Sequence, residues 1–223
     1  MRSETIVRLG AGRYAVFSAG VECGEERWSI DRGPEGYIIS GAQEMVRPHP
    51  LPGRQEYRVT LSEQWRVTGV EIRWRVGERE LLATHRAEAD RWRVRIEYDG
   101  QIKEQEGDFP PVCEVDFGTH LFSTILLARR DFAVGGEHEF TALRIGPPYM
   151  AVLPERMLYR CVEASIRPTP AGPRPARRYM VGVPARGEPG FSFWSDERGI
   201  VLESFQGPES DDPWMRLVDY EWT

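Results

Sequence analysis

The stretch DFGTHLFSTILLARR, from Asp116 to Arg130, decides the fold, because it is the one apolar run with helical spacing in a chain that otherwise alternates like β-strands. Leu121 and Ile125 are spaced to lie on one helical face, as in an amphipathic helix. Asp116 precedes the run, and Arg129 and Arg130 close it, so each charge suits the helix macrodipole at its own end. We therefore expect one short helix over residues 116–130.

Most other segments alternate apolar and polar residues with the period of two that marks half-buried strands. The cleanest segment is 91–98, where Trp92 and Val94 point one way while Arg93 and Arg95 point the other. More than ten such segments can be read along the chain, with glycine and proline turns between them. This pattern predicts an all-β protein.

One of these segments changes phase, which predicts its shape. Val67 shares the parity of Trp65, whereas Val70 and the apolar residues after it take the opposite parity, with Gly69 at the change. A β-bulge produces such a shift, and bulges bend strands so that a sheet curls. A lone helix among many bent strands then predicts a strongly curved antiparallel sheet that forms an open, incompletely closed barrel around a helical plug.

The length of 223 residues fits one large all-β domain, and we expect a single domain over residues 1–223. The segment RPTPAGPRPARR, residues 167–178, is the one low-complexity stretch. Too little chain follows it to build a second core. We therefore interpret it as a flexible loop rich in proline and arginine inside the domain, rather than as a linker between domains.

Charge and composition exclude some partners and indicate a compartment. The net charge is −6 and the arginines are interleaved with glutamates, whereas nucleic-acid binding needs a basic face that displaces counterions. The N-terminal residues contain no apolar core of signal-peptide length, and nowhere do about 18 apolar residues run together to span a membrane. We therefore expect a cytoplasmic protein with no membrane span and no nucleic-acid partner.

Motifs for chemistry are scarce. Cys23, Cys113 and Cys161 are odd in number and widely spaced, which favours three buried thiols over a disulfide framework or a zinc site. There is no G-x-S-x-G elbow and no glycine-rich phosphate loop before a helix, and the four histidines are far apart along the chain. Asp116 and His120 stand four residues apart, which fits an acid–base pair or a simple contact at the helix start. We expect no catalytic residue, no metal and no cofactor.

Aromatic residues are numerous, with seven tryptophans and eight tyrosines. Trp65, Trp74, Trp92 and Tyr98 lie on alternating strand faces, so each faces either the core or a cavity. A barrel of about eight strands is filled by its own side chains, whereas more strands leave room for a lined cavity. Both interpretations stay open for each of these residues.

Three motifs carry a resemblance to a known family. They read SEQWRV with Trp65, AEADRW with Asp90 and Trp92, and EVDFGTHLFSTILLARRDF across the helical region. In this order they resemble the Putative glycolipid-binding family, whose fold is related to the bacterial lipoprotein-carrier (LolA-like) proteins. The positions that match the family motif are Asp116, Thr119, Thr124, Arg129 and Arg130, whereas Ser123 and Leu127 replace its asparagine and proline.

The resemblance implies a curved, incompletely closed sheet with a helical plug and a hydrophobic cavity for lipid or glycolipid between them. An acyl chain needs apolar walls and gains about 0.8 kcal/mol for each buried methylene. A head group needs arginine forks and aromatic rings at the mouth, and we expect Arg129 or Arg130 near an opening.

We therefore expect non-enzymatic binding of a hydrophobic or amphipathic small molecule in the barrel cavity. Two alternatives stay open: an enzyme, a hydrolase or isomerase acting on a lipid-like substrate in the same cavity, and an interaction module with a filled core. An open sheet edge would also invite a homodimer. The candidate ligand-binding residues are Trp65, Trp74, Trp92, Tyr98, Phe122, Leu126, Arg129, Arg130, Tyr159 and Tyr179.

Overall fold

The computed structural model describes residues 6–184, 189–207 and 212–223, which form fifteen strands and one α-helix. All fifteen strands belong to one sheet, in the order β8-β7-β6-β5-β4-β3-β2-β1-β15-β14-β13-β12-β11-β10-β9. The helix is α1 (Leu121–Arg129), and the strands are β1 (Val7–Ser18), β2 (Val21–Gly33), β3 (Gly36–Met45), β4 (Gly53–Leu61), β5 (Val67–Val76), β6 (Arg79–Glu88), β7 (Arg91–Tyr98), β8 (Gln101–Asp108), β9 (Glu114–Asp116), β10 (Glu137–Gly146), β11 (Ala151–Arg167), β12 (Arg174–Gly182), β13 (Pro189–Asp196), β14 (Val201–Phe205) and β15 (Pro213–Trp222).

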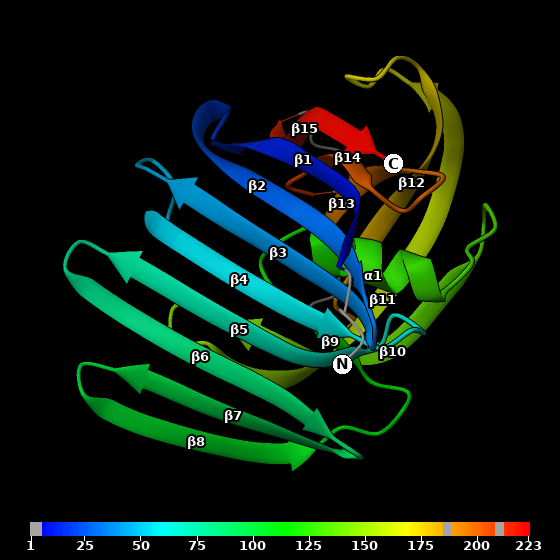
Figure 1. Cartoon of the computed structure of the whole chain (residues 1–223). Coiled ribbons are helices and arrows are strands. Elements are labelled where there is room, and N and C mark those ends of the chain that lie inside the picture. Colours follow the sequence, from blue (N-terminus) through cyan, green and yellow to red (C-terminus); the bar gives the residue numbers. More distant parts are fainter. Residues whose placement is uncertain (1–5, 185–188, 208–211) are drawn as a thin grey trace.

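The sheet is a meander whose first and last strands meet in its middle. Strands that follow one another in sequence pair antiparallel from β1 to β8 and again from β10 to β15, and β1 pairs antiparallel with β15. The short strand β9 is the exception, because it pairs parallel with β10. β8 and β9 are therefore the two ends of the sheet (Figure 1).

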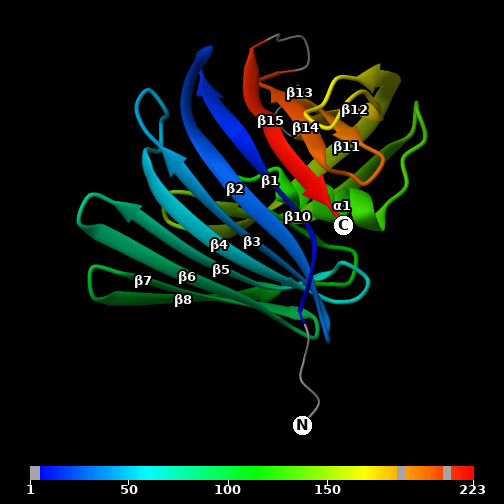
Figure 2. The same cartoon turned by 45° about the horizontal axis from the view of Figure 1, so that its top comes forward.

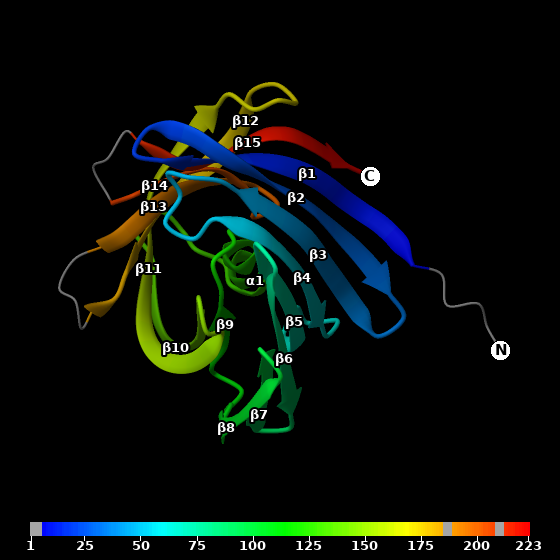
Figure 3. The same cartoon turned by 90° about the vertical axis from the view of Figure 1, so that its left-hand side faces the viewer.

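The sheet curls strongly and surrounds α1 on its concave side (Figures 1 and 3). Seen from the turned direction of Figure 2, β1 to β8 form one wide curved wall, and the strands from β10 onward form the other. Among the described residues, no hydrogen-bonded strand pair joins β8 to β9, so the barrel stays open. The predicted open barrel around a helical plug is confirmed.

The bulge expected at Gly69 lies in the β4–β5 pair. Thr60 pairs with Gly69 and Leu61 pairs with Val67, so Thr68 is the extra residue on β5. Register shifts also interrupt the pairing of β1 with β2, of β11 with β12 and of β12 with β13. Because each irregularity adds twist and bend, they account for the curling of so long a sheet.

The helix is shorter than the sequence predicts, and its expected start at Asp116 is wrong. Asp116 is the last residue of β9 and pairs with Arg144 in the parallel ladder to β10. This ladder holds its backbone extended, and residues 117–120 form a loop before α1 begins at Leu121. His120 is the N-cap residue and makes no side-chain capping bond.

α1 is a buried plug rather than an amphipathic surface helix. Every residue from Leu121 to Leu126 is buried. Leu121 and Phe122 belong to the large core cluster, which extends over β1 to β7, whereas Leu126 joins a smaller cluster with Tyr159 and Phe193. The helix therefore fills the concave side and packs against both walls of the sheet.

Half of the low-complexity segment is strand. β11 extends through Arg167 and β12 begins at Arg174, so the connection between them is residues 168–173. The loop predicted over 167–178 is therefore too long, because its C-terminal part pairs with β11 up to Arg178. No helix in the described ranges is long and apolar enough to cross a membrane.

The three cysteines confirm the expected burial. Cys23, Cys113 and Cys161 are buried free thiols that pack among apolar side chains.

One side chain bridges the gap between the two walls. Gln105 on β8 donates from Nε2 to the carbonyl oxygen of Val152 on β11 at 2.8 Å, and its Oε1 accepts the Val152 amide at 3.1 Å. The side-chain amide thus bonds to one residue of β11 through both a donor and an acceptor, as a neighbouring strand would.

Candidate functional site

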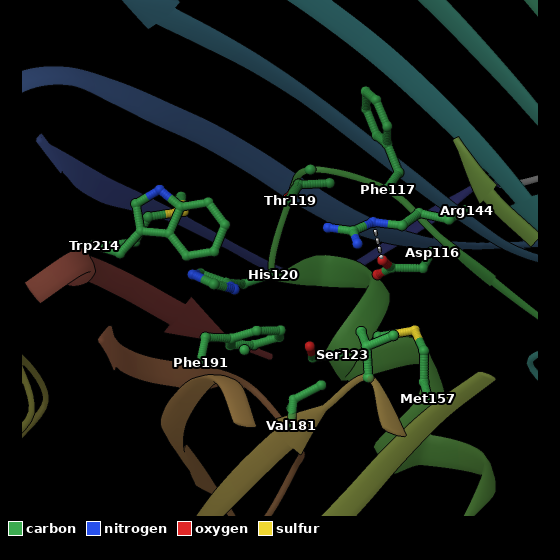
Figure 4. Close-up of a pocket in the computed structure, with 14 residues that line it drawn as sticks. Asp116, Phe117, Thr119, His120, Ser123, Arg144, Met157, Val181, Phe191 and Trp214 are labelled. Atoms are coloured by element: carbon green, nitrogen blue, oxygen red, sulfur yellow. Dashed lines mark ion pairs between the residues drawn. The ribbon is translucent and has the colours of Figure 1, made fainter. Parts of the chain in front are cut away.

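A pocket of about 210 Å³ lies beside the start of α1, and we call it the helix-start pocket (Figure 4). Its walls come from the loop before α1, from α1 itself and from strands β9, β10, β11, β12, β13 and β15, several of which are far apart in the sequence. The lining residues are Asp116, Phe117, Gly118, Thr119, His120, Ser123, Arg144, Met157, Val181, Val183, Gly190, Phe191, Trp214 and Met215.

One wall of the pocket is polar and contains an ion pair. Arg144 Nε lies 3.6 Å from an Asp116 carboxylate oxygen (Figure 4). Arg144 Nη1 lies 2.8 Å from a carboxylate oxygen of Glu155. Burial and the negative charge of Glu155 raise the pKa of Asp116 to about 6, although the positive charge of Arg144 lowers it. Asp116 therefore carries a proton part of the time near neutral pH and can donate as well as accept a hydrogen bond.

His120 lines the same pocket, and a buried hydroxyl group forms a hydrogen bond with its ring. A 2.6 Å hydrogen bond joins its Nε2 to the hydroxyl of Ser204, which is fully buried on β14. Burial lowers the pKa of His120 to about 4, so its ring is neutral at physiological pH. No cluster of three or more His, Cys, Asp and Glu side chains that could hold a metal ion occurs among the residues that the structure describes.

The other wall is aromatic and apolar. The rings of Trp214 and Phe191 meet edge to face with their centroids 6.0 Å apart, and Trp214 also meets the ring of His120 at 5.4 Å. Val181 and Met157 continue this apolar surface (Figure 4). Hydrogen-bonding groups on one side and ring faces on the other suit a ligand that is polar at its edges and apolar on its faces.

A second hollow, of about 980 Å³, lies at the other end of α1, and we call it the helix-end groove. Arg129 and Arg130 line it and share the buried carboxylate of Glu114, with Arg130 Nη2 at 2.9 Å. Arg177 pairs with Asp131 at 3.2 Å on the same groove. Carboxylates already pair with these arginines, and their expected place at the mouth of a ligand cavity stays a prediction.

The structure brings together only some of the predicted ligand-binding residues. Arg129, Arg130 and Tyr179 line the helix-end groove. Tyr159 lies behind the helix-start pocket, where its hydroxyl is 3.1 Å from the hydroxyl of Ser123. Three of the four residues therefore share the helix-end groove, and Tyr159 lines neither hollow.

Four other predicted residues are packed in the core. Phe122 and Leu126 are on α1, Trp74 is on β5, and Trp92 is on β7 with its ring centroid 5.0 Å from that of Phe109. None of the four is more than 9% exposed. A ligand could reach them only after the interior rearranged, so their role as ligand contacts stays a prediction.

The last two predicted residues lie at the surface. Trp65 is half-buried in the turn between β4 and β5 and stacks on Tyr37, with centroids 4.5 Å apart. Tyr98 is 37% exposed at the end of β7, where its hydroxyl accepts a hydrogen bond from Arg79. Neither residue lines the helix-start pocket or the helix-end groove.

Sequence reasoning missed Arg144, Phe191 and Trp214 as site residues. They stand on β10, β13 and β15 and become neighbours only because the sheet curls, a relation that no local pattern encodes. Asp116 and His120 do share the pocket, although a loop rather than a helical turn separates them.

Comparisons with known proteins agree with this architecture. A family model described as Putative glycolipid-binding matches residues 20–174, a range that contains the loop before α1, α1, β10 and β11. Trp214 and Phe191 lie outside the matched range. No curated protein sequence matches the chain.

Two solved structures share the fold. A DUF1089-family protein from Pseudomonas aeruginosa has 17% sequence identity and a TM-score of 0.53, with 82% of this chain and 89% of that chain covered. A β-barrel-like protein of the domain of unknown function DUF1849 from Brucella abortus has 12% identity and a TM-score of 0.58, with 100% and 99% covered. At these identities the likeness shows the β-barrel-like fold alone.

Proposed function

Because the chain belongs to the Putative glycolipid-binding family, we propose that it binds an amphipathic small molecule of the glycolipid class without catalysing a reaction. The polar head group lies in the helix-start pocket. The observation that carries this proposal is the meeting of an ion-paired polar wall with an aromatic wall in one pocket.

A sugar head group fits both walls of the pocket. Its hydroxyls can exchange hydrogen bonds with Asp116, Arg144 and Ser123, while the apolar face of the ring packs on Trp214. The volume of about 210 Å³ equals the space of about seven water molecules at about 30 Å³ each. The pocket therefore suits one ring, and the alkyl part of the ligand lies outside it.

The first test measures the affinity for octyl β-glucoside, below its micelle concentration, by isothermal titration calorimetry. Trp214→Ala removes the ring platform and is expected to weaken binding about tenfold, or about 1.4 kcal/mol. Trp65→Ala is the matched control, because it removes a tryptophan that stacks on Tyr37 away from the pocket. Its affinity is expected to stay within about twofold of the wild type.

Two outcomes would contradict this assignment. If the wild type bound neither octyl β-glucoside nor any amphiphile in a broad lipid panel, the binding function would be wrong. If Trp65→Ala weakened binding and Trp214→Ala did not, the ligand would lie near the sequence-predicted aromatic residues rather than in the helix-start pocket.

One observation favours a second candidate function, the hydrolase or isomerase. Asp116 has a pKa of about 6 and shares the pocket with a neutral His120, and perturbed acids and bases in one pocket mark many catalytic sites. Turnover of 4-nitrophenyl glycosides or esters, lost in Asp116→Asn, would establish this function. Binding without turnover in the wild type would exclude it for these substrates.

Three finer expectations from the sequence stay proposals. These are the relation to the lipoprotein-carrier (LolA-like) fold, the cytoplasmic location and the homodimer.

For the homodimer, the exposed edge strand β8 carries Lys103, Glu104 and Glu106. Charges on an edge disfavour edge-to-edge pairing, so sedimentation equilibrium is expected to show a dimer only if another surface forms it.

A further inference from the structure

A row of buried polar side chains crosses the inner wall of the barrel. Tyr14, Glu26, Gln43 and Gln55 are register partners on β1, β2, β3 and β4, and we call them the buried polar row. None is more than 5% exposed. Trp74 on β5 continues the row, because it pairs with Gln55. Four adjacent polar positions on the concave face of a sheet are unusual, since this face is otherwise apolar.

The row holds the loop that precedes α1. Gln43 Nε2 donates to the carbonyl oxygen of Gly118 at 3.2 Å, and the Thr119 hydroxyl donates to Glu26 Oε1 at 2.5 Å. The Tyr57 hydroxyl also donates to Glu26 Oε1. Within the row, Gln55 Nε2 donates to Gln43 Oε1 at 3.3 Å.

The same loop lines the helix-start pocket on its other side. Phe117, Gly118 and Thr119 are lining residues of that pocket, although Figure 4 shows the Phe117 ring pointing away from its centre. These three residues therefore form a wall, one strand of backbone thick, between the pocket and the buried polar row. A Cβ atom built on Gly118 would meet nothing within 4 Å, so the loop has open space beside it.

Several polar atoms along the row have no hydrogen-bond partner within the described part of the chain. They are Glu26 Oε2, the Tyr14 hydroxyl and Trp74 Nε1, on side chains that are 0%, 0% and 9% exposed. Buried polar groups in native proteins are almost always paired, and a water molecule or a ligand hydroxyl can supply the partner that these atoms lack within the chain. The Glu26 carboxylate oxygen can accept a hydrogen bond, and the hydroxyl of its register partner Tyr14 can both accept and donate, as the hydroxyls of a sugar require.

We propose that the buried polar row is the inner half of the ligand site and binds sugar hydroxyls once the loop Phe117–Thr119 moves aside. In the structure the Gly118 carbonyl and the Thr119 hydroxyl occupy the positions that ligand oxygens take in the complex. The inference rests on the proposed function, because it assigns a second group of residues to the same head group. The loop and the ligand therefore compete for the polar atoms of the buried polar row.

The test titrates octyl β-glucoside and, as a probe without a sugar, an octyl tetraethylene glycol ether, both below their micelle concentrations. Gln55→Met keeps the side-chain volume and removes the amide, so the affinity for the glucoside is expected to fall about tenfold while that for the ether is unchanged. Gln101→Met, an exposed glutamine on β8, is the matched control and is expected to change neither affinity.

Thr119→Val is expected to change the affinity for the glucoside in the opposite direction. It removes the bond from the loop to Glu26, so the loop is displaced at lower cost and the glucoside is expected to bind about threefold more tightly. If the row only supported the fold, Thr119→Val and Gln55→Met would both weaken binding or leave it unchanged. Either result would overturn the inference.

The outcomes separate this inference from the proposed function. If the wild type and Gln55→Met bind the glucoside equally while Trp214→Ala binds it about tenfold more weakly, the pocket assignment stands and the row does not contact the ligand. If the wild type fails to bind the glucoside, both the pocket assignment and the ligand-binding role of the buried polar row are wrong.

A measurement on the wild type covers the case in which Gln55→Met does not fold. Amide hydrogen exchange at residues 117–121 is expected to accelerate when the glucoside is bound, because the displaced loop exposes its amides to water. Slower exchange there on binding would show that the loop stays in place, against the inference.

Discussion

Gly41 shows how the lack of one side chain shapes the interior. A Cβ atom at Gly41 would lie 2.2 Å from the Tyr57 hydroxyl, and one at Gly12 would lie 2.6 Å from the ring of Trp28. Both glycines are register partners of Trp28. They leave the space in which Tyr57 and Trp28 lie against the inner wall, and Tyr57 thereby reaches Glu26.

Gly41→Ala is therefore expected to destabilise the fold. The added methyl group forces the Tyr57 ring away from Glu26, and such overpacking costs about 1–3 kcal/mol in the free energy of unfolding. Urea unfolding monitored by tryptophan fluorescence measures the loss. Gly107→Ala on the edge strand β8, where a Cβ would meet nothing within 4 Å, is expected to change stability by less than about 0.5 kcal/mol. Equal effects of the two substitutions would contradict the packing argument.

Asp116 is expected to make stability depend on pH. Burial raises its pKa from 3.8 to about 6, so the folded chain binds this proton more tightly than the unfolded chain does. The stabilising contribution of protonated Asp116 to the free energy of unfolding is then present below about pH 4 and is lost as the pH rises to about 6. The free energy of unfolding of the wild type minus that of Asp116→Asn should fall by roughly 2 kcal/mol across this window.

Urea titrations from about pH 4 to about pH 8 measure this difference. Glu26, whose pKa burial also raises, is present in both chains, so its contribution cancels. A difference that is constant with pH would show that the Asp116 pKa is not raised in the fold.

At the scale of elements, the sequence predicts the strands well and the start of the helix poorly. The alternation around Trp92 and the phase change at Gly69 are local consequences of strand geometry, and both appear in the structure. The start of α1 depends instead on the pairing of β9 with β10, a contact between residues far apart in sequence. This pairing keeps Asp116 extended, although its charge suits the first turn of a helix.

The site was only partly predictable for the same reason. Asp116 and His120 could be noticed together because they are four residues apart. Trp214 and Arg144 meet them only through the curl of the whole sheet. The aromatic strand residues such as Trp92 suggested a wide cavity, but the helix and its neighbours fill that space with side chains.

The C-terminal end of α1 depends on Glu114. Its carboxylate, 7% exposed, binds both Arg129 and Arg130, so Glu114→Gln leaves two partly buried guanidinium groups without their anion. We expect a loss of roughly 2–4 kcal/mol in the free energy of unfolding. Glu139→Gln breaks the exposed pair with Arg156 and is expected to cost less than about 1 kcal/mol. Thermal or urea unfolding of the two variants compares them, and similar losses would argue against a role for Glu114 in holding α1.

At the scale of the whole molecule, the open seam is the feature that distinguishes this sheet from a closed barrel. Gln105 joins β8 to β11 across it through both atoms of its side-chain amide. Gln105→Leu removes these two bonds, so we expect the Val152 amide to exchange its hydrogen about tenfold faster or more. The exposed Gln101→Leu is the control on the same strand. Unchanged exchange at Val152 in Gln105→Leu would show that the seam is held by other contacts.

The place of the chain termini in the sheet has one more consequence. The Thr223 amide bonds to the carbonyl oxygen of Leu9, so the last residue of the chain lies beside the start of β1, whereas the two ends of the sheet, β8 and β9, are joined by residues 109–113. A circular permutant that links Thr223 to the start of β1 and begins at the exposed Val112 would follow the sheet from one edge to the other in chain order. Every pair of neighbouring strands would then be consecutive in sequence. Because contact order falls in such a chain, it should reach the same sheet faster than the natural one does.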